Sequence, residues 1–328
     1  MTSYVNTVEI DGFTPISKTV KKRKTSKLLR KERAVAFLFI LAPVISFTIF
    51  TIIPMFVALF LSFLNYDPLT MEYTFAENYG FKNYIDLFDL SGPTGREFIK
   101  CVTNTLVYII EVPIAIGLGL LCATLANSKG CRKSNTVYRV LLYLPTVCSA
   151  VAAGIIWRVI FAYDDTAGIK YTGIINAIFG NKWNFLGDDN LVLVAIILKN
   201  SINGMGSAMI LYYASMCNIS KEYYEAAEMD GASGLRQFAH ITFPMLTPVT
   251  FYLLIMRLAG CLQSYSDARI FAAGRGRTIV YFIWEYGINS SGGASYSLAS
   301  AAAIVLGVAI MTITIIQFKL SNKWVLDL

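Results

Sequence analysis

Apolar residues along the chain gather into six long blocks that polar segments separate. The blocks cover about residues 34–64, 101–126, 137–162, 191–216, 249–266 and 297–318. A helix needs about 20 apolar residues to cross a bilayer, whereas the strands of an outer-membrane barrel are alternating segments of about 10 residues. The pattern therefore predicts an all-α membrane protein with six transmembrane helices, and it excludes a β-barrel.

The composition agrees with this prediction. Of the 328 residues, 55% are hydrophobic and only 15% are charged, and the mean hydropathy is +0.56. Soluble domains of this length carry more charge and less apolar surface. We therefore divide the chain into a basic tail at 1–33, a six-helix transmembrane domain at 34–318 and a second tail at 319–328.

Basic residues concentrate immediately before the first apolar block. Nine Lys or Arg residues lie between Lys18 and Arg33, where each gains about 1 kcal/mol near anionic lipid. The two tails and the even-numbered loops together carry 16 Lys or Arg residues, most of them in the N-terminal run, whereas the odd-numbered loops carry fewer. This asymmetry predicts a multi-pass protein with both termini in the cytoplasm. No basic face interleaved with aromatic residues follows, so nucleic acid is excluded as a partner.

Catalytic chemistry has little support in the sequence. The six cysteines show no C-x-x-C spacing and the chain has one histidine, His240, so neither a metal site nor a nucleophile-base pair is predicted. The phosphate-binding motif G-x-x-x-x-G-K-[ST] does not occur. We expect a protein that is not an enzyme and holds no cofactor or metal itself.

Prolines interrupt the first three blocks, and one amphipathic segment lies outside them. Pro43, Pro54, Pro113 and Pro145 should each release a backbone carbonyl and bend a helix. The segment GFKNYIDLF at residues 80–88 mixes aromatic and charged residues at helical spacing. It is typical of a helix in the membrane interface.

Polar residues in the fourth block share one helix face. Lys199, Asn203 and Ser207 follow at four-residue intervals, with Asn200 beside them. A charge at the centre of a span costs about 2.5–3.5 kcal/mol on insertion scales, so such a face must look into the bundle or toward water. Two alternatives explain this polar face: it lines a path for a solute, or it forms hydrogen bonds to neighbouring helices.

The fifth block adds Arg257, Gln263 and Asp267. Together with the fourth block, these amides, hydroxyls and charges suit a polyhydroxy solute, because each sugar hydroxyl both donates and accepts a hydrogen bond. Further candidates have an alternative explanation: a Glu and an Arg can neutralise each other across the bundle, and a Trp near a boundary fits an aromatic belt. These further candidates are Asn104, Glu111, Trp157 and Arg158.

The loop at 218–248 has the organisation of two short helices. Ser220 is placed to cap a helix over 221–229, and acidic residues in its first turns favour the positive end of the helix dipole. Asp230-Gly231 provides a turn, since glycine tolerates positive φ. A second helix is expected from Gly234 until Pro244 limits it.

This loop resembles the EAA loop of binding-protein-dependent ABC importers. The resemblance rests on Glu225-Ala226-Ala227, Asp230-Gly231-Ala232, Phe238, Ile241, Pro244 and Pro248. The segments GFKNYIDLF, LLYLPTVCSAVAAGIIWRVIF, GIINAIFG, WNFLG and QFKL are similar to sugar permeases of the maltose and glycerol-phosphate type. The resemblance covers nearly the whole chain from about residue 34. One departure is AAGRGRT at 272–278, where relatives often carry a glycine-rich turn, and it leaves the geometry of the outer loop at 269–296 open.

The resemblance implies the permease fold of type I ABC importers, with the EAA loop as coupling helices, and a place in the inner membrane of a prokaryotic cell. It implies a second six-span permease, two ATPase subunits that hold ATP and magnesium, membrane lipid, and an extracellular or periplasmic solute-binding protein as partners. The implied solute is a carbohydrate, with an oligosaccharide favoured and glycerol phosphate or another polar metabolite as the alternative. A stand-alone ion-coupled transporter would require paired midplane carboxylates or inverted repeats, which the sequence does not show.

Overall fold

The computed structural model describes residues 27–67, 72–127, 135–164, 171–179, 183–289 and 295–321. The predicted tails lie largely outside these ranges, as does most of the basic loop between the second and third spans. The chain divides into two compact units, residues 1–56 and 57–328.

The described part of the first unit contains most of the first predicted span. Helix α1 (Lys27–Phe47) continues through the π turn η1 (Thr48–Ile52) into α2 (Ile53–Leu61), which carries the chain into the second unit. The π turn lies just before Pro54, whose ring would clash with a carbonyl of a regular α-helix. The widened turn lets Val35–Leu61 remain one helix of 27 residues with high hydropathy.

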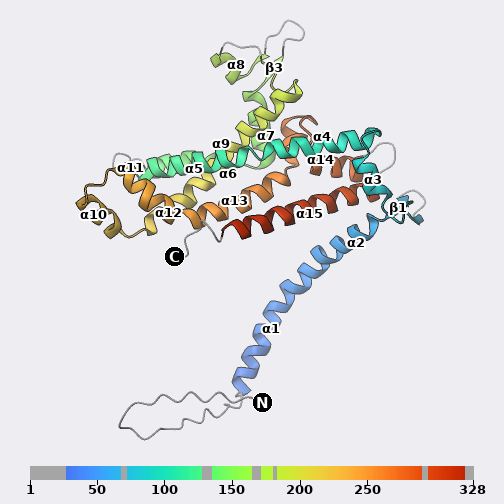
Figure 1. Ribbon diagram of the computed structural model, residues 1–328, viewed down its shortest axis with the longest axis horizontal. Helices are drawn as coiled ribbons and strands as arrows, with labels where there is room; N and C mark the ends of the chain where they lie inside the picture. Colours follow the sequence, from blue (N-terminus) through green and yellow to red (C-terminus); the bar gives the residue numbers. More distant parts are fainter. Residues whose placement is uncertain are drawn as a thin grey trace. The chain divides into compact units, whose positions relative to one another are not determined.

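Long helices lying side by side form the body of the second unit (Figure 1). Helices α4 (Pro93–Tyr108) and α5 (Glu111–Asn127) form one span, which packs along α9 (Asp189–Asn218). Helices α13 (Thr247–Leu262) and α15 (Tyr296–Ser321) complete the set. Small residues allow α5 and α9 to approach, since a Cβ at Gly119 would lie only 2.5 Å from the Cβ of Ala208.

The third predicted span is two helices. Helices α6 (Asn135–Val147) and α7 (Ala150–Ile160) meet at an angle of 101°. Pro145 lies inside α6, and the break follows at Cys148-Ser149, where Ser149 Oγ accepts a hydrogen bond from the Ala152 amide at 3.2 Å. The chain therefore turns because a new helix begins at a capping serine, a stronger change of direction than the bend predicted at the proline.

The second loop helix ends at Met245, one residue after the limit predicted at Pro244. Helix α11 (Gly234–Gln237) continues through the π turn η4 (Phe238–Thr242) into α12 (Phe243–Met245), and a bend of 60° then leads into α13. The Phe243 amide bonds the carbonyl of Phe238, five residues back. As before Pro54, a π turn upstream of the proline lets the helix accommodate it.

Short elements lie beyond the long helices, and among them α3 (Lys82–Phe88) lies at the opposite end of the bundle from α10 (Lys221–Met229) (Figure 1). The predicted helix at 80–88 is present as α3. Strands β1 (Leu64–Asp67) and β2 (Glu72–Phe75) pair antiparallel. The remaining short elements are β3 (Tyr163–Asp164), β4 (Tyr171–Thr172), α8 (Ile174–Phe179), η5 (Asp267–Phe271), α14 (Ile279–Trp284) and η6 (Glu285–Asn289).

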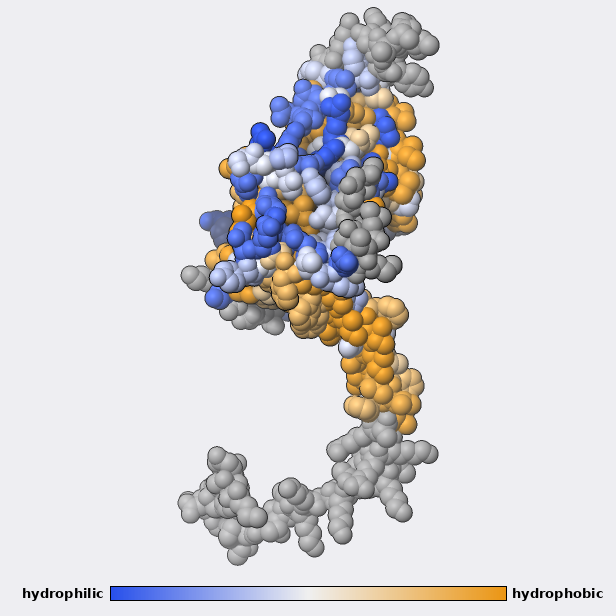
Figure 2. All heavy atoms as spheres, turned by 90° about the vertical axis from the view of Figure 1, so that its right-hand side faces the viewer, coloured by the Kyte–Doolittle hydropathy of each residue, from blue (hydrophilic) through white to orange (hydrophobic). Residues whose placement is uncertain are grey.

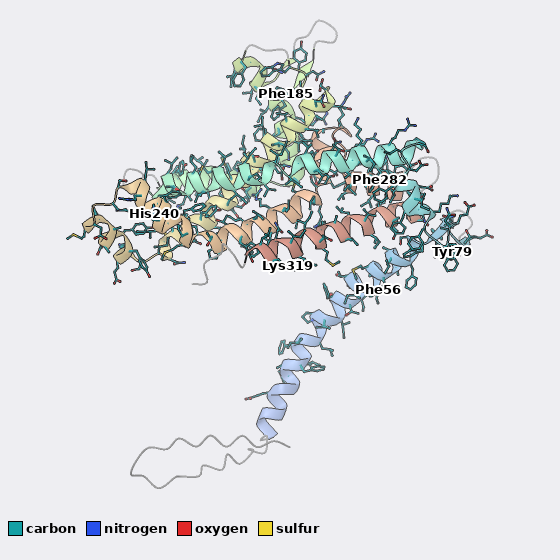
Figure 3. All side chains as sticks on the ribbon, viewed as in Figure 1. Phe56, Tyr79, Phe185, His240, Phe282 and Lys319 are labelled. Carbon is teal, nitrogen blue, oxygen red and sulfur yellow. The ribbon has the colours of Figure 1, made fainter. Side chains whose placement is uncertain are left out.

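Two apolar clusters hold the second unit together. The larger lies between α5, α9 and α13 around Tyr108, Met209 and Tyr212. The smaller joins α3, α4, α14 and α15 around Phe98 and Phe282, the latter labelled in Figure 3. Figure 2 looks onto the end that carries α3, where hydrophilic side chains gather beside a hydrophobic flank. The helices are thus fixed to one another by two cores, and the polar end lies beyond them.

Candidate functional site

A cavity of about 440 Å³ opens where the break between α6 and α7 meets α5, α9, α13 and the residues that follow α13. Its wall is rich in amides, hydroxyls and charges. The polar side chains on the wall are Glu111, Thr146, Lys199, Asn200, Asn203, Arg257, Gln263, Ser264, Tyr265, Ser266 and Asp267. Six of the seven predicted solute-path residues are among them. Ser207 does not line the cavity, but its Oγ accepts a hydrogen bond from Arg257 Nη2.

A buried ion pair forms one side of the wall. Lys199 Nζ lies 2.5 Å from Asp267 Oδ1, and the two side chains are 7% and 12% exposed. Asp267 Oδ2 accepts hydrogen bonds from Asn200 Nδ2 at 2.7 Å and from Ser264 Oγ at 2.6 Å. Lys199 also donates to Asn200 Oδ1 at 2.8 Å. Both buried charges are therefore compensated by a partner and by additional hydrogen bonds.

Arg257 reaches from α13 to the backbone of α9. Its Nη2 donates to the carbonyl oxygen of Gly204 and to Ser207 Oγ, the latter at 2.9 Å. A Cβ at Gly204 would collide with the guanidinium group. The glycine is thus required for the approach of the arginine, and Arg257 cross-links α13 to α9.

Asn203 connects the broken third span to α9. Its Oδ1 accepts from Trp157 Nε1 at 3.1 Å, and its carbonyl accepts from Thr146 Oγ1 at 2.7 Å. Trp157 also stacks on Phe161, with ring centroids 5.8 Å apart. The tryptophan is therefore half-buried against the core, which differs from the alternative of an aromatic belt.

The other alternative, mutual neutralisation of Glu111 and Arg158, is wrong. Glu111 is 6% exposed and lies on the cavity wall, whereas Arg158 is exposed on α7. Asn104 lies elsewhere, donating from Nδ2 to the carbonyl of Arg277 at 3.0 Å.

The sequence did not predict Thr146 as a cavity residue, although the break after α6 brings it to the cavity. Pro145 was the available signal, although it did not indicate how sharply the chain turns.

The loop between α9 and α13 forms the predicted pair of helices. Helix α10 covers Lys221–Met229 as expected, and Ser220 Oγ accepts from the Glu222 amide at 3.4 Å. Gly231 has φ +75°, and the Ala232 amide bonds the carbonyl of Ala227 at 2.9 Å. The capping serine and the turn glycine are therefore confirmed, because both depend on local backbone geometry.

Contacts between the two loop helices leave one acidic and partly apolar surface free. Tyr224 Oη and Thr242 Oγ1 lie 2.9 Å apart, and Gln237 Nε2 donates to the Ala232 carbonyl at 3.1 Å. Residues at this junction are half-buried, namely Ala227, Ala232, Phe238, Ile241 and Pro244. The exposed residues include the acidic Glu222, Glu225, Glu228 and Asp230, the apolar Ala226, Met229 and Leu235, Gly231, and the basic Lys221 and Arg236. Figure 3 places His240 at this end of the bundle.

The segment AAGRGRT forms a compact turn in the outer loop. Ala273, Gly274 and Gly276 all have positive φ, at 50°, 87° and 58°. Tyr108 Oη donates to the carbonyl of Gly276 at 2.8 Å, which ties the turn to α4. An ion pair between Arg277 and Glu97 adds a second link to the same helix. Two glycines thus provide the backbone freedom that this turn requires.

Comparison with known proteins gives one family for most of the chain. The family model described as "Binding-protein-dependent transport system inner membrane component" matches residues 115–326. The chain is 32% identical over 319 residues to the probable ABC transporter permease protein YesP of Bacillus subtilis, covering 92% of this chain and 95% of that protein. It is 28% identical to the arabinooligosaccharides transport system permease protein AraP of the same organism, covering 94% and 96%.

A solved structure shares the helical arrangement. It is a chain of a bacterial alginate ABC transporter in complex with an alginate pentasaccharide-bound periplasmic protein. The TM-score is 0.75 at 22% identity, covering 92% of this chain and 98% of that chain. At this level of identity, the likeness concerns the fold.

Proposed function

The chain belongs to the family of inner-membrane components of binding-protein-dependent transport systems, and on that premise we propose that its polar cavity conducts a carbohydrate. The predicted ABC importer permease fold is confirmed by the family match and by the likeness to the alginate transporter chain. The chain is a membrane-spanning permease subunit. We propose, in addition, the class of its solute, its contacts with partner subunits and its orientation in the membrane.

The polar cavity between α9 and α13 is the observation that carries the proposal. Its wall combines amide and hydroxyl groups with four charged groups, of which Lys199 and Asp267 form an ion pair, and this suits solutes whose hydroxyls both donate and accept. The name of the relative AraP indicates arabinooligosaccharides as its cargo. An oligosaccharide delivered by an extracellular binding protein is the solute class that these features support best.

Energy input is proposed to come from partner subunits. We assign ATP and magnesium to two ATPase subunits, which contact the exposed surface of α10 and α11, and a second six-span permease completes the pathway. The exposed acidic residues Glu225 and Glu228 and the apolar Met229 and Leu235, which are 89% and 84% exposed, support this assignment. With this surface in the cytoplasm, both termini are cytoplasmic and the end with α3 faces outward.

Connectivity explains how motion at the coupling surface would reach the cavity. Helix α10 begins three residues after α9 ends, and α12 leads into α13 through the 60° bend. Helices α9 and α13 carry the Lys199 and Arg257 sides of the cavity. A displacement of α10–α12 therefore acts on both walls at once, as alternating access between two states requires.

The test is reconstitution of the purified complex with its binding protein in proteoliposomes. We measure the uptake of three labelled solutes, with ATP either inside or outside the proteoliposomes. The solutes are arabinotriose, maltotriose and sn-glycerol 3-phosphate. We expect ATP-dependent uptake of a trisaccharide, and copurification of a second six-span chain with an ATPase. Uptake of the glycerol phosphate alone, or a chain that purifies as a homo-oligomer, contradicts the proposal.

A further inference from the structure

We infer that Glu111 selects the solute: its carboxylate accepts a hydroxyl group of a neutral saccharide and disfavours solutes that carry a carboxylate or phosphate. This inference rests on the proposed function and narrows the solute class to neutral sugars. Three features of the cavity support it, namely an oxygen atom without a hydrogen-bond partner, a neutral balance of charge, and a guanidinium group on the same wall that has more N–H donors than its two acceptors use.

The unsatisfied atom is Glu111 Oε2. Glu111 is the first residue of α5 and is 94% buried, yet it lies on the cavity wall. Among the residues that the structure describes, Oε2 has no hydrogen-bond partner. A buried carboxylate oxygen is costly to leave unpaired. Since this oxygen belongs to a cavity-lining side chain, a hydroxyl of the solute is a suitable donor.

The charge balance of the wall disfavours an anion. Lys199 is neutralised by Asp267 at 2.5 Å. Glu111 and Arg257 then remain as one carboxylate and one guanidinium, and neither takes part in the five ion pairs among the described residues. Two cations and two carboxylates leave the wall neutral. A solute carboxylate or phosphate would therefore enter a buried site uncompensated and beside Glu111.

Arg257 can donate a hydrogen bond to a hydroxyl oxygen of the same sugar. Its Nη2 donates to Gly204 and Ser207, and a guanidinium has five N–H donors in total. A sugar with neighbouring hydroxyls can donate from one to Glu111 and accept at another from Arg257. Hydrogen bonds that involve a charged partner are shorter and stronger than neutral ones, so this pair would favour polyols over less hydroxylated solutes.

A purely structural role makes a different prediction. If Glu111 only balanced the charge of Arg257, its replacement would change assembly of the complex and would affect all solutes equally. If Glu111 selects the solute, the ratio of affinities for neutral and anionic solutes must change. Measurement of this ratio separates the two roles.

The experiment compares arabinotriose with arabinotrionic acid, its analogue oxidised at the reducing end. Saturation-transfer NMR on the full detergent-solubilised complex, without binding protein, gives a Kd for each probe. We expect the wild type to bind arabinotriose at least tenfold more tightly than the acid. Glu111→Gln, which removes the charge and keeps an acceptor, should reduce this preference to less than threefold. Glu111→Leu should weaken arabinotriose binding tenfold or more.

Glu72→Gln is the matched control, because it makes the same change of charge at an exposed position of β2. It should leave both affinities unchanged. An unchanged ratio in Glu111→Gln, with saccharide uptake by the wild type intact, overturns this inference alone. A wild-type complex that retains ATPase activity stimulated by its binding protein, yet takes up and binds neither trisaccharide, contradicts the proposed solute class before any variant is compared.

Discussion

Lys199 Nζ and Asp267 Oδ1 lie 2.5 Å apart although 68 positions separate the residues in the chain. The pair links the middle of α9 to the π turn that follows α13. Both side chains are nearly buried, so each depends on the other for compensation of its charge. This dependence gives a prediction about stability.

Replacing one member of the pair should destabilise the protein more than replacing both. Lys199→Met leaves Asp267 uncompensated, and breaking a buried pair costs about 3–5 kcal/mol. The double variant Lys199→Met with Asp267→Leu should recover at least half of the lost Tm in thermal unfolding of the detergent-solubilised complex. Equal Tm values for the single and double variants would show that the pair is not energetically coupled.

Gly204 should be intolerant of any side chain. A Cβ at this position collides with the guanidinium of Arg257, so Gly204→Ala must displace the arginine from the wall. We expect at least a tenfold loss of saccharide uptake by an assembled complex. Gly117→Ala on α5 is the control, because a Cβ there meets nothing within 4 Å. Comparable uptake by the two variants would contradict the assigned position of Arg257.

The turn between the loop helices should be sensitive to backbone strain. Gly231 has φ +75° with nothing within 4 Å of a built Cβ, so Gly231→Val is opposed by conformation alone, at about 1–2 kcal/mol. ATP turnover stimulated by the binding protein should fall in this variant, while membrane insertion persists. Gly234→Ala is the control, since a Cβ there also meets open space and its φ is not positive.

The charge on the exposed face of α10 should affect ATP turnover independently of the backbone conformation at Gly231. Glu225 is exposed, so Glu225→Lys reverses a charge with little effect on packing. Lower ATP turnover is expected because the charge pattern that an ATPase subunit would meet is altered. If Gly231→Val and Glu225→Lys both retain wild-type turnover, the coupling role of this loop is refuted.

The proposed orientation predicts opposite labelling of two exposed positions. Tyr79 is fully exposed near α3, and Met229 is 89% exposed at the end of α10. In a background without native cysteines, Tyr79→Cys should react with a membrane-impermeant maleimide on intact spheroplasts. Met229→Cys should react only after permeabilisation. The reverse pattern would place α10 outside and exclude contact with a cytoplasmic ATPase.

The sequence by itself determined the features that depend on neighbouring residues. Six apolar blocks indicated membrane helices, because bilayer thickness sets the length of an apolar segment. Ser220 and Gly231 indicated where α10 begins and ends, because capping and positive φ are local properties. The four-residue spacing from Lys199 to Asn203 placed both on one face of α9, and the structure brings both to the cavity wall.

Tertiary structure alone decided which polar groups meet. The partner of Lys199 is far away in the chain, and the 101° turn after α6 brings Thr146 to the cavity. Likewise, the packing of α5, α9 and α13 places Glu111 and Arg257 on the same wall, and among the described residues Glu111 Oε2 has no hydrogen-bond partner. Such pairings depend on helix positions that long-range packing sets, and local residue patterns do not contain that information.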